Sequence, residues 1–293
     1  MSVEPLPPEL SPLLVEDAVR AALLEDLGRA GDVTTLSTIS AGVGARTAIR
    51  TRQHGTLSGM AIAEAAFRAL DPMIVFERKA NDGDRIEPGQ TVATIRGPAR
   101  SVLSAERVAL NFLMHLCGIA THTQRFADAI AHTDARVCCT RKTLPGLRAF
   151  EKYAVRCGGG SNHRFGLDDA ILIKDNHIAV RGGVREAVES ARAYAGHLMS
   201  VEVEVDTLEQ LREAINAGPD AVLLDNMTLD QLREGVAIVR GADRPIAIEA
   251  SGNVDLDTIA AIAETGVDYI STSKITMAAP PLDIGLDIAL DAG

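Results

Sequence analysis

The chain has 293 residues, of which 46% are hydrophobic and 24% are charged, and its formal net charge is −11 at pH 7. This length and balance are typical of a soluble globular protein with one large α/β domain and a smaller second domain. The negative charge argues against nucleic acid or an anionic membrane as the partner, because both would repel such a surface.

The sequence predicts neither a secretion signal nor a membrane span. Residues 1–12 are rich in proline and acidic side chains and lack a basic region followed by an apolar one. We find no apolar run that approaches the roughly 20 residues needed to cross a bilayer. The cysteines have no Cys-x-x-Cys spacing, which favours buried thiols in a reducing compartment and predicts a cytoplasmic location. They are Cys117, Cys138, Cys139 and Cys157.

The first part of the chain predicts an α+β sandwich domain. Its elements, in order, are a helix at 15–27 that ends at Gly28, a strand at 46–52, a helix at 61–70, a strand at 74–79, turns at 81–90 and a strand at 91–95. Ser104 is predicted to be the N-cap of the helix that follows. Strands and helices mixed in this way differ from a regular βαβ series. We place this domain at residues 1–118, joined by the C-terminal segment 278–293.

From about Arg136 the pattern changes to strand followed by helix. Strands are predicted at 136–140, 170–174, 201–205, 221–224, 245–249 and 268–271, and helices at 207–217, 229–240 and 256–265. This alternation favours a parallel sheet covered by helices. Because only six strands are clear, an irregular or open parallel β/α barrel at residues 119–277 fits better than a closed eightfold one. Neither a Gly-x-Gly-x-x-Gly turn nor a Walker lysine motif is present, so Rossmann and P-loop folds are not favoured.

Polar side chains follow these strands at the point where each apolar run stops. In a β/α barrel, the C-terminal strand ends meet at one mouth, and that mouth holds the active site. Packing does not explain polar residues at every one of these positions. We therefore predict a functional site formed by Arg141, Lys142, Lys174, Glu204, Asp225, Ser251 and Ser271.

The basic residues of this acidic chain concentrate between Thr140 and His177. Arginine binds carboxylate or phosphate through two parallel hydrogen bonds, and lysine supplies a compact charge. Arg141, Arg164 and Lys174 are therefore predicted to hold a dicarboxylate, with His163 as a further donor. Any single arginine has the alternative role of a solvated loop residue or a structural ion pair. Two residues are set apart: Arg148 is interpreted as a surface or subunit-contact residue, and His177 as structural.

Two acids, Glu204 and Asp225, end neighbouring strands and are candidate ligands for Mg²⁺. They have alternatives: contact with ribose hydroxyls, stabilisation of positive charge on a sugar, or, for Asp225, a helix N-cap. Glu202 points to the same side of its strand as Glu204 but lies further from the mouth. The loops 251–253 and 271–273 fit a phosphate cradle, with ordinary turn chemistry as the alternative.

Taken together, the motifs closely resemble the quinolinate phosphoribosyltransferase family over nearly the whole chain. The resemblance is carried by Thr140-Arg-Lys-Thr-Leu-Pro-Gly-Leu-Arg148, Gly158-Gly-Gly-Ser-Asn-His-Arg-Phe-Gly166, Ile173-Lys-Asp-Asn-His177, Leu224-Asp-Asn226 and Glu249-Ala-Ser-Gly252. It implies transfer of a phosphoribosyl group from phosphoribosyl pyrophosphate to quinolinate, with Mg²⁺, in the biosynthesis of NAD. The expected products are nicotinate mononucleotide, pyrophosphate and CO₂. It also implies a homo-oligomer that is at least a dimer.

The resemblance further implies roles for individual residues. Arg107 would reach into the neighbouring subunit's site. Quinolinate would be bound by Arg107, Arg141, His163, Arg164 and Lys174. Phosphoribosyl pyrophosphate would be bound by Lys142, Lys174, Glu204, Asp225, Ser251, Gly252, Asn253, Ser271 and Ser273, with the metal at Glu204 and Asp225. The chain departs from the family at Asn253 and Ser273, where glycine is frequent, and at Met277, where histidine or glutamine is usual.

Two other functions remain open at this point. A Schiff-base lyase or aldolase would use Lys174 as its nucleophile. A non-catalytic module is suggested by residues 83–95, which resemble the hairpin of a lipoyl-like domain but lack a lysine at its tip.

Overall fold

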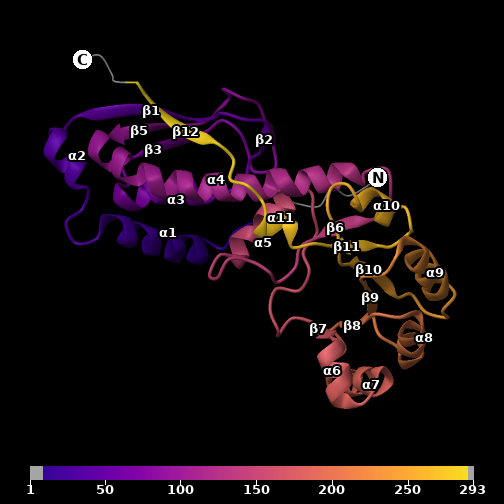
Figure 1. The fold of residues 1–293 in the computed structure, drawn as a ribbon. Helices are drawn as coiled ribbons and strands as arrows, with labels where there is room; N and C mark the ends of the chain where they lie inside the picture. The colour runs from indigo at the N-terminus through magenta and orange to yellow at the C-terminus, as the bar shows by residue number, and fades with distance from the viewer. Residues whose placement is uncertain (1–8, 290–293) are drawn as a thin grey trace. The chain divides into compact units, whose positions relative to one another are not determined.

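The computed structural model of the chain describes residues 9–289 (Figure 1). Residues 1–8 and 290–293 lie outside the described residues. The first range carries part of the expectation about a secretion signal, and the second belongs to the predicted C-terminal segment. The described chain divides into two compact units. The first contains the chain up to Gln124, Ala149–Gly159 and the segment from Ala279 onward, and the second contains Arg125–Arg148 and Gly160–Ala278.

The first unit is built on a four-stranded antiparallel sheet. Its order is β12 (Ile284–Ala289), β1 (Gly44–Thr51), β5 (Thr91–Pro98) and β3 (Val75–Arg78). The C-terminal strand therefore pairs with the first strand of the chain. Figure 1 shows α3 (Met60–Leu70) and α4 (Ala99–Ala129) along one side of this sheet, and α1 (Pro12–Leu27) lies beside α3. The other elements are α2 (Val33–Thr38), β2 (Gly55–Thr56), β4 (Arg85–Ile86) and most of α5 (Arg148–Cys157).

Helix α4 corrects one expectation and bears on another. It begins at Ala99, directly after β5, so Ser104 lies inside the helix and is not its N-cap. The Ser104 hydroxyl instead donates to Asp32 Oδ2 at 3.0 Å. By length and composition, α4 is also the one described helix that could cross a membrane. Because 56% of its most apolar stretch is buried, α4 fits the core helix of a folded unit better than a membrane span.

The second unit contains one parallel sheet of six strands, in the order β6-β11-β10-β9-β8-β7. The strands are β6 (Arg136–Cys138), β7 (Ile171–Ile173), β8 (Val201–Val205), β9 (Ala221–Asp225), β10 (Ala247–Ser251) and β11 (Tyr269–Ser271). All six predicted strands are therefore confirmed. Among residues 9–289 no strand pairing joins β6 to β7, so the sheet is open, as expected for an incomplete barrel. The helices are α6 (Asp175–Arg181), α7 (Val184–Tyr194), α8 (Leu208–Ala217), α9 (Leu229–Arg240), α10 (Ile259–Ala263) and α11 (Lys274–Met277).

Alternating side chains explain how β8 faces both the core and the mouth. Val201, Val203 and Val205 are fully buried, whereas Glu202 and Glu204 are half-buried on the opposite side. A strand with period-two alternation directs its apolar side chains to one face and its acids to the other. The acids of β8 therefore line the inner side of the open barrel, which is where the site lies.

One further expectation of the sequence is met in the fold. Cys117, Cys138 and Cys139 are buried and outside any disulfide, as predicted. At Gly158, an added Cβ would lie 2.3 Å from the carbonyl oxygen of Ala120. Only glycine allows this approach, so the first residue of the Gly158-Gly-Gly160 run is fixed by close backbone packing.

Candidate active site

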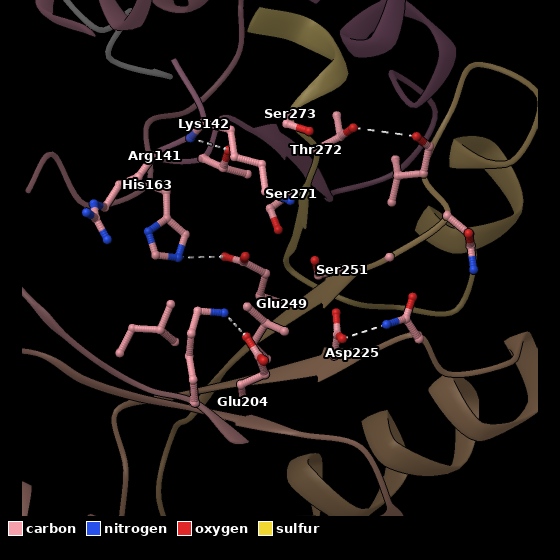
Figure 2. Close-up of a pocket in the computed structure, with 18 of the residues that line it drawn as sticks. Arg141, Lys142, His163, Glu204, Asp225, Glu249, Ser251, Ser271, Thr272 and Ser273 are labelled. Atoms are coloured by element: carbon pink, nitrogen blue, oxygen red, sulfur yellow. Dashed lines mark hydrogen bonds and ion pairs between the residues drawn. The ribbon is translucent and has the colours of Figure 1, made fainter. Parts of the chain in front are cut away.

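A cavity of about 730 Å³ opens at the C-terminal ends of the parallel strands (Figure 2). It lies entirely within the second unit. Arg107 is an exposed residue of α4 in the first unit and does not line this cavity. All the other predicted site residues do: Arg141, Lys142, His163, Arg164, Lys174, Glu204, Asp225, Ser251, Gly252, Asn253, Ser271 and Ser273.

Two arginines form the basic side of the cavity. Arg164 donates from Nη1 to the carbonyl oxygen of Ala170 at 3.0 Å, which holds its guanidinium in place. The Nε atoms of Arg141 and Arg164 are buried and have no hydrogen-bond partner within the described chain. Burial, and then the nearby charge of Arg141, lower the pKa of Arg164. Two close cations with buried, unpartnered donors are suited to binding an anion.

The loop that carries Arg141 and Lys142 is braced by Arg148. Its guanidinium donates to Thr143 Oγ1 at 3.0 Å, to the Phe165 carbonyl at 3.0 Å and to the Arg141 carbonyl at 3.3 Å. The interpretation of Arg148 as a surface residue misses this bracing role. Arg148 is distant in sequence from the end of β6, so the sequence does not indicate that the loop folds back onto the start of α5.

Other residues hold the loop and the following strand end. The Thr276 hydroxyl donates to the Lys142 carbonyl at 2.8 Å. At the next strand end, His177 Nδ1 accepts from the backbone N–H of Lys174 at 2.9 Å and so caps the start of α6. This contact agrees with the structural role predicted for His177.

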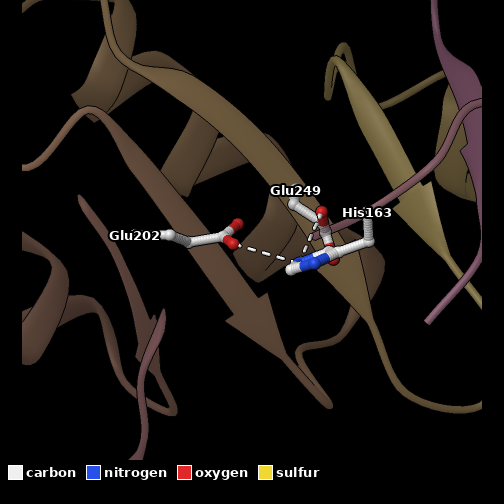
Figure 3. A group of neighbouring side chains, drawn as sticks. All are labelled: His163, Glu202 and Glu249. Atoms are coloured by element: carbon white, nitrogen blue, oxygen red, sulfur yellow. Dashed lines mark ion pairs between the residues drawn. The ribbon is translucent and has the colours of Figure 1, made fainter. Parts of the chain in front are cut away.

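His163 and Glu249, which line the cavity, form a cluster with Glu202, which does not line it (Figure 3). His163 Nε2 lies 3.1 Å from a carboxylate oxygen of Glu202 and 3.7 Å from one of Glu249. The backbone N–H of Arg164 donates to His163 Nδ1 at 2.7 Å. Because Nδ1 accepts this bond, a neutral His163 carries its proton on Nε2 and donates it toward the two glutamates.

This hydrogen bonding decides between two uses of the cluster. The three ligand atoms lie within 4.8 Å of one another, a spacing that would suit a metal ion. A metal would need the Nε2 lone pair, however, and that nitrogen is the protonated one. Burial, and then the charge of Glu202, raise the pKa of Glu249 to about 7. The cluster therefore fits the sharing of protons better than the binding of a metal.

The alternation that directs Glu202 to the same side as Glu204 also indicates where Glu249 points. Glu202 and Glu249 each lie two residues before a residue already predicted at the mouth, Glu204 and Ser251 respectively. Period-two alternation places each pair on one face of its strand. The inner face of the barrel is therefore polar for two layers, and Glu249 of the deeper layer is the residue that the sequence analysis did not single out.

The acidic side of the cavity is formed by Glu204 and Asp225. Lys174 Nζ forms an ion pair with Glu204 Oε2. Asp225 Oδ2 accepts from Asn226 Nδ2 at 2.6 Å. Helix α9 is capped by Thr228, whose hydroxyl accepts from the backbone N–H of Gln231 at 3.3 Å, so the N-cap alternative for Asp225 is wrong.

Comparison with known proteins gives consistent matches over almost the whole chain. Residues 32–117 match the quinolinate phosphoribosyl transferase N-terminal domain family, and residues 119–287 match the corresponding C-terminal domain family. The chain is 43% identical over 267 residues to the probable nicotinate-nucleotide pyrophosphorylase (carboxylating) of Bacillus subtilis, covering 91% of each chain. It is 42% identical over 279 residues to the nicotinate-nucleotide pyrophosphorylase (carboxylating) of Mycobacterium leprae, covering 93% of this chain and 96% of that one.

Solved structures agree with these matches. The crystal structure of NadC from Streptococcus pyogenes has a TM-score of 0.91 and 41% identity, covering 96% of this chain and 99% of that one. The nicotinate-nucleotide pyrophosphorylase of Francisella tularensis has a TM-score of 0.90 and 36% identity, covering 98% of this chain and all of that one (100%). Sequence and fold are therefore similar to those proteins from near one end of the chain to near the other.

Proposed function

The chain belongs to the quinolinate phosphoribosyltransferase family, and from this premise we propose how its pocket binds the two substrates. The reaction transfers a phosphoribosyl group from phosphoribosyl pyrophosphate to quinolinate in the biosynthesis of NAD. It yields nicotinate mononucleotide, pyrophosphate and CO₂. The chemistry requires a site for a dicarboxylate beside a site for a pyrophosphate and its metal.

Quinolinate is assigned to the basic side of the cavity. The observation that carries this assignment is the pair of buried Nε atoms of Arg141 and Arg164 without partners. A dicarboxylate would supply acceptors for both and would offset the repulsion between the two guanidiniums. Lys174 completes this side next to Glu204. For His163, contact with quinolinate stays a prediction, because its Nε2–H is directed at Glu202 and Glu249.

Phosphoribosyl pyrophosphate is assigned to the opposite side. Glu204 and Asp225 offer carboxylate oxygens of the kind that Mg²⁺ prefers, and Lys142 is an exposed cation that lines the same cavity. When bound, Mg²⁺ would neutralise charge on the departing pyrophosphate. The 5′-phosphate is assigned to the loops after β10 and β11, which offer hydroxyls and backbone N–H groups at Ser251, Gly252, Asn253, Ser271 and Ser273.

The residues act mainly by positioning and charge. Arg141, Arg164 and Lys174 hold the two carboxylates, so that the ring nitrogen faces C1 of the ribose from the side opposite pyrophosphate. Glu204 and Asp225 stabilise positive charge that develops on the sugar as pyrophosphate leaves. The ring nitrogen, once bonded to C1, is cationic and stabilises the carbanion formed when the adjacent carboxylate departs as CO₂. A proton then replaces the carboxylate on that carbon.

Assembly and location are also proposed. A homo-oligomer, at least a dimer, would let the exposed Arg107 of one subunit enter the site of the next. Cytoplasmic location is supported by four cysteines that form no disulfide within the described chain, of which three are buried. The alternative of a Schiff-base lyase or aldolase is not favoured, because the relatives are phosphoribosyltransferases and Lys174 is engaged with Glu204 in an anion-binding pocket. No observation supports the non-catalytic module.

The binding assignment is tested by Arg141→Ala. We expect a lower rate at subsaturating quinolinate and an unchanged KM for phosphoribosyl pyrophosphate, because Arg141 serves only the dicarboxylate side. Arg233→Ala is the matched control, since Arg233 forms an exposed pair with Asp230 on α9 and is remote from the lining of the cavity. Normal turnover of Arg141→Ala at subsaturating quinolinate would show that the assignment of Arg141 is wrong.

A further inference from the structure

The loop that follows β9 contains an unusual backbone conformation. Asn226 has a φ of 53°, and Asn253, in the loop after the adjacent strand β10, has a φ of 51°. Among residues 9–289 these are the only positive-φ residues other than glycine, and both line the same cavity. The left-handed region is unfavourable for residues with a Cβ, and asparagine is tolerated there because its side chain bonds locally. Such conformations concentrate at functional sites.

The contacts of Asn226 join two parts of the cavity. Its Nδ2 donates to Asp225 Oδ2 at 2.6 Å, and its backbone N–H donates to the Ser251 carbonyl at 2.9 Å. A Cβ on Gly252 would lie 2.1 Å from Asn226 Oδ1, and Gly252 itself has a φ of 93°. The side chain of Asn226 is therefore packed between the carboxylate that ends β9 and the loop that follows β10.

The start of the next helix does not account for this arrangement. Helix α9 has its own N-cap at Thr228, with a reciprocal contact from Gln231. Asn226 thus lies between strand and helix without a capping role. What it contacts is Asp225, and Figure 2 shows the carboxylate of Asp225 at the cavity with this hydrogen bond drawn to its side.

The chemical effect of the contact is to orient a carboxylate. An isolated aspartate side chain rotates freely, and the N–H of a neighbouring amide restricts that rotation without adding charge. One oxygen, Oδ2, accepts from Asn226, so the remaining lone pairs of the group are directed elsewhere. Hydrogen bonds to ligating carboxylates commonly set their geometry, and their loss costs 10- to 100-fold in affinity.

We propose that Asn226 is a positioning residue that orients Asp225 for binding the complex of phosphoribosyl pyrophosphate with Mg²⁺. This inference rests on the proposed function, which assigns that substrate to Asp225. Asn226 acts on one side of the cavity only: the arginines of the other side are held by contacts with Arg148 and Ala170. Loss of the Asn226 amide should therefore weaken the binding of phosphoribosyl pyrophosphate with Mg²⁺ and leave the binding of quinolinate unchanged.

Asn226→Gly is the first test, because glycine keeps the left-handed backbone while removing the amide. Asn226→Asp is the second, since it preserves the shape, deletes the N–H donor and places a like charge beside Asp225. We expect the Kd of phosphoribosyl pyrophosphate with Mg²⁺, measured by calorimetry, to rise about 10-fold or more in both variants. The Kd of quinolinate alone should stay within about two-fold of wild type, which also shows that each variant is folded.

A double-mutant cycle separates positioning from a general structural role. In an Asp225→Ala background there is no carboxylate to orient, so Asn226→Gly should change the Kd of the metal-bound substrate by less than about two-fold. Equal losses in both backgrounds, or an unchanged Kd in the single variants, would overturn the proposal. If the wild-type chain fails to turn over quinolinate with phosphoribosyl pyrophosphate, the proposed function fails instead, and the two outcomes are distinguishable.

Discussion

Replacement of Arg164 by glutamine should weaken quinolinate binding without destabilising the empty protein. Its loss removes the hydrogen bond from Nη1 to the Ala170 carbonyl, which contributes about 1 kcal/mol. It also removes a buried Nε–H that has no partner within the described chain, a relief of about 1–3 kcal/mol, and a charge close to Arg141. The free energy of unfolding should therefore stay within about 1 kcal/mol of wild type or rise.

Binding of quinolinate, in contrast, should become weaker in Arg164→Gln. Each hydrogen bond between a guanidinium and a carboxylate contributes about 1.5–3 kcal/mol, so loss of the fork should cost about 3 kcal/mol. That corresponds to a roughly 100-fold higher KM for quinolinate, because every 1.4 kcal/mol is about tenfold. Initial rates over a range of quinolinate concentrations give KM, and urea unfolding of the unliganded protein gives stability.

A matched control separates binding from structure. Arg192 is another half-buried arginine, and it forms two hydrogen bonds to Asp220, at 2.8 and 2.9 Å, and one to the Gly218 carbonyl. Because its donors are satisfied, Arg192→Gln should lower stability and leave the quinolinate KM unchanged. If Arg164→Gln behaves like this control, the interpretation of its unpartnered donor as a quinolinate contact is refuted.

Two further predictions concern the loop that carries Arg141 and the carboxyl group of Glu249. Arg148→Ala deletes three hydrogen bonds that brace the Arg141 loop. The KM for quinolinate should therefore rise about 10-fold, and the KM for phosphoribosyl pyrophosphate should rise less. Equal changes in the two KM values would argue against selective bracing. Burial raises the pKa of Glu249 from its ordinary value of 4.5 to about 7, so the folded state binds more protons than the unfolded state between these values. The contribution of Glu249 to the free energy of unfolding should therefore be largest below pH 4.5. It should fall by on the order of 3 kcal/mol as the pH rises from 4.5 through 7. Glu249→Gln should flatten that part of the pH profile in urea unfolding, and an unchanged slope would contradict the assignment.

The sequence predicts the second unit well because its strands are short apolar runs bounded by polar residues. All six strands of the parallel sheet appear where alternation with amphipathic helices places them. The mouth of the barrel follows from the polar residues at or just after the C-terminal end of each strand. These features are local in the sequence, so periodicity alone reveals them.

The errors arise where tertiary contacts decide the outcome. Ser104 has the side chain of an N-cap, but α4 starts five residues earlier and the hydroxyl bonds Asp32, which is distant in the sequence. Arg148 is bound to a carbonyl 17 residues away, which no local pattern indicates. Asn226 is not marked by any local pattern, and its left-handed backbone and its contact with Asp225 appear only in the folded chain.

The most direct test of the central claim compares two ring acids as acceptors. The purified protein is supplied with phosphoribosyl pyrophosphate and Mg²⁺, and with either quinolinate or nicotinate, which lacks the second carboxylate. We predict formation of nicotinate mononucleotide from quinolinate with release of one CO₂ per pyrophosphate, and a far lower kcat/KM for nicotinate. Equal use of nicotinate would contradict the account, because the paired arginines would then contribute nothing to the recognition of a dicarboxylate.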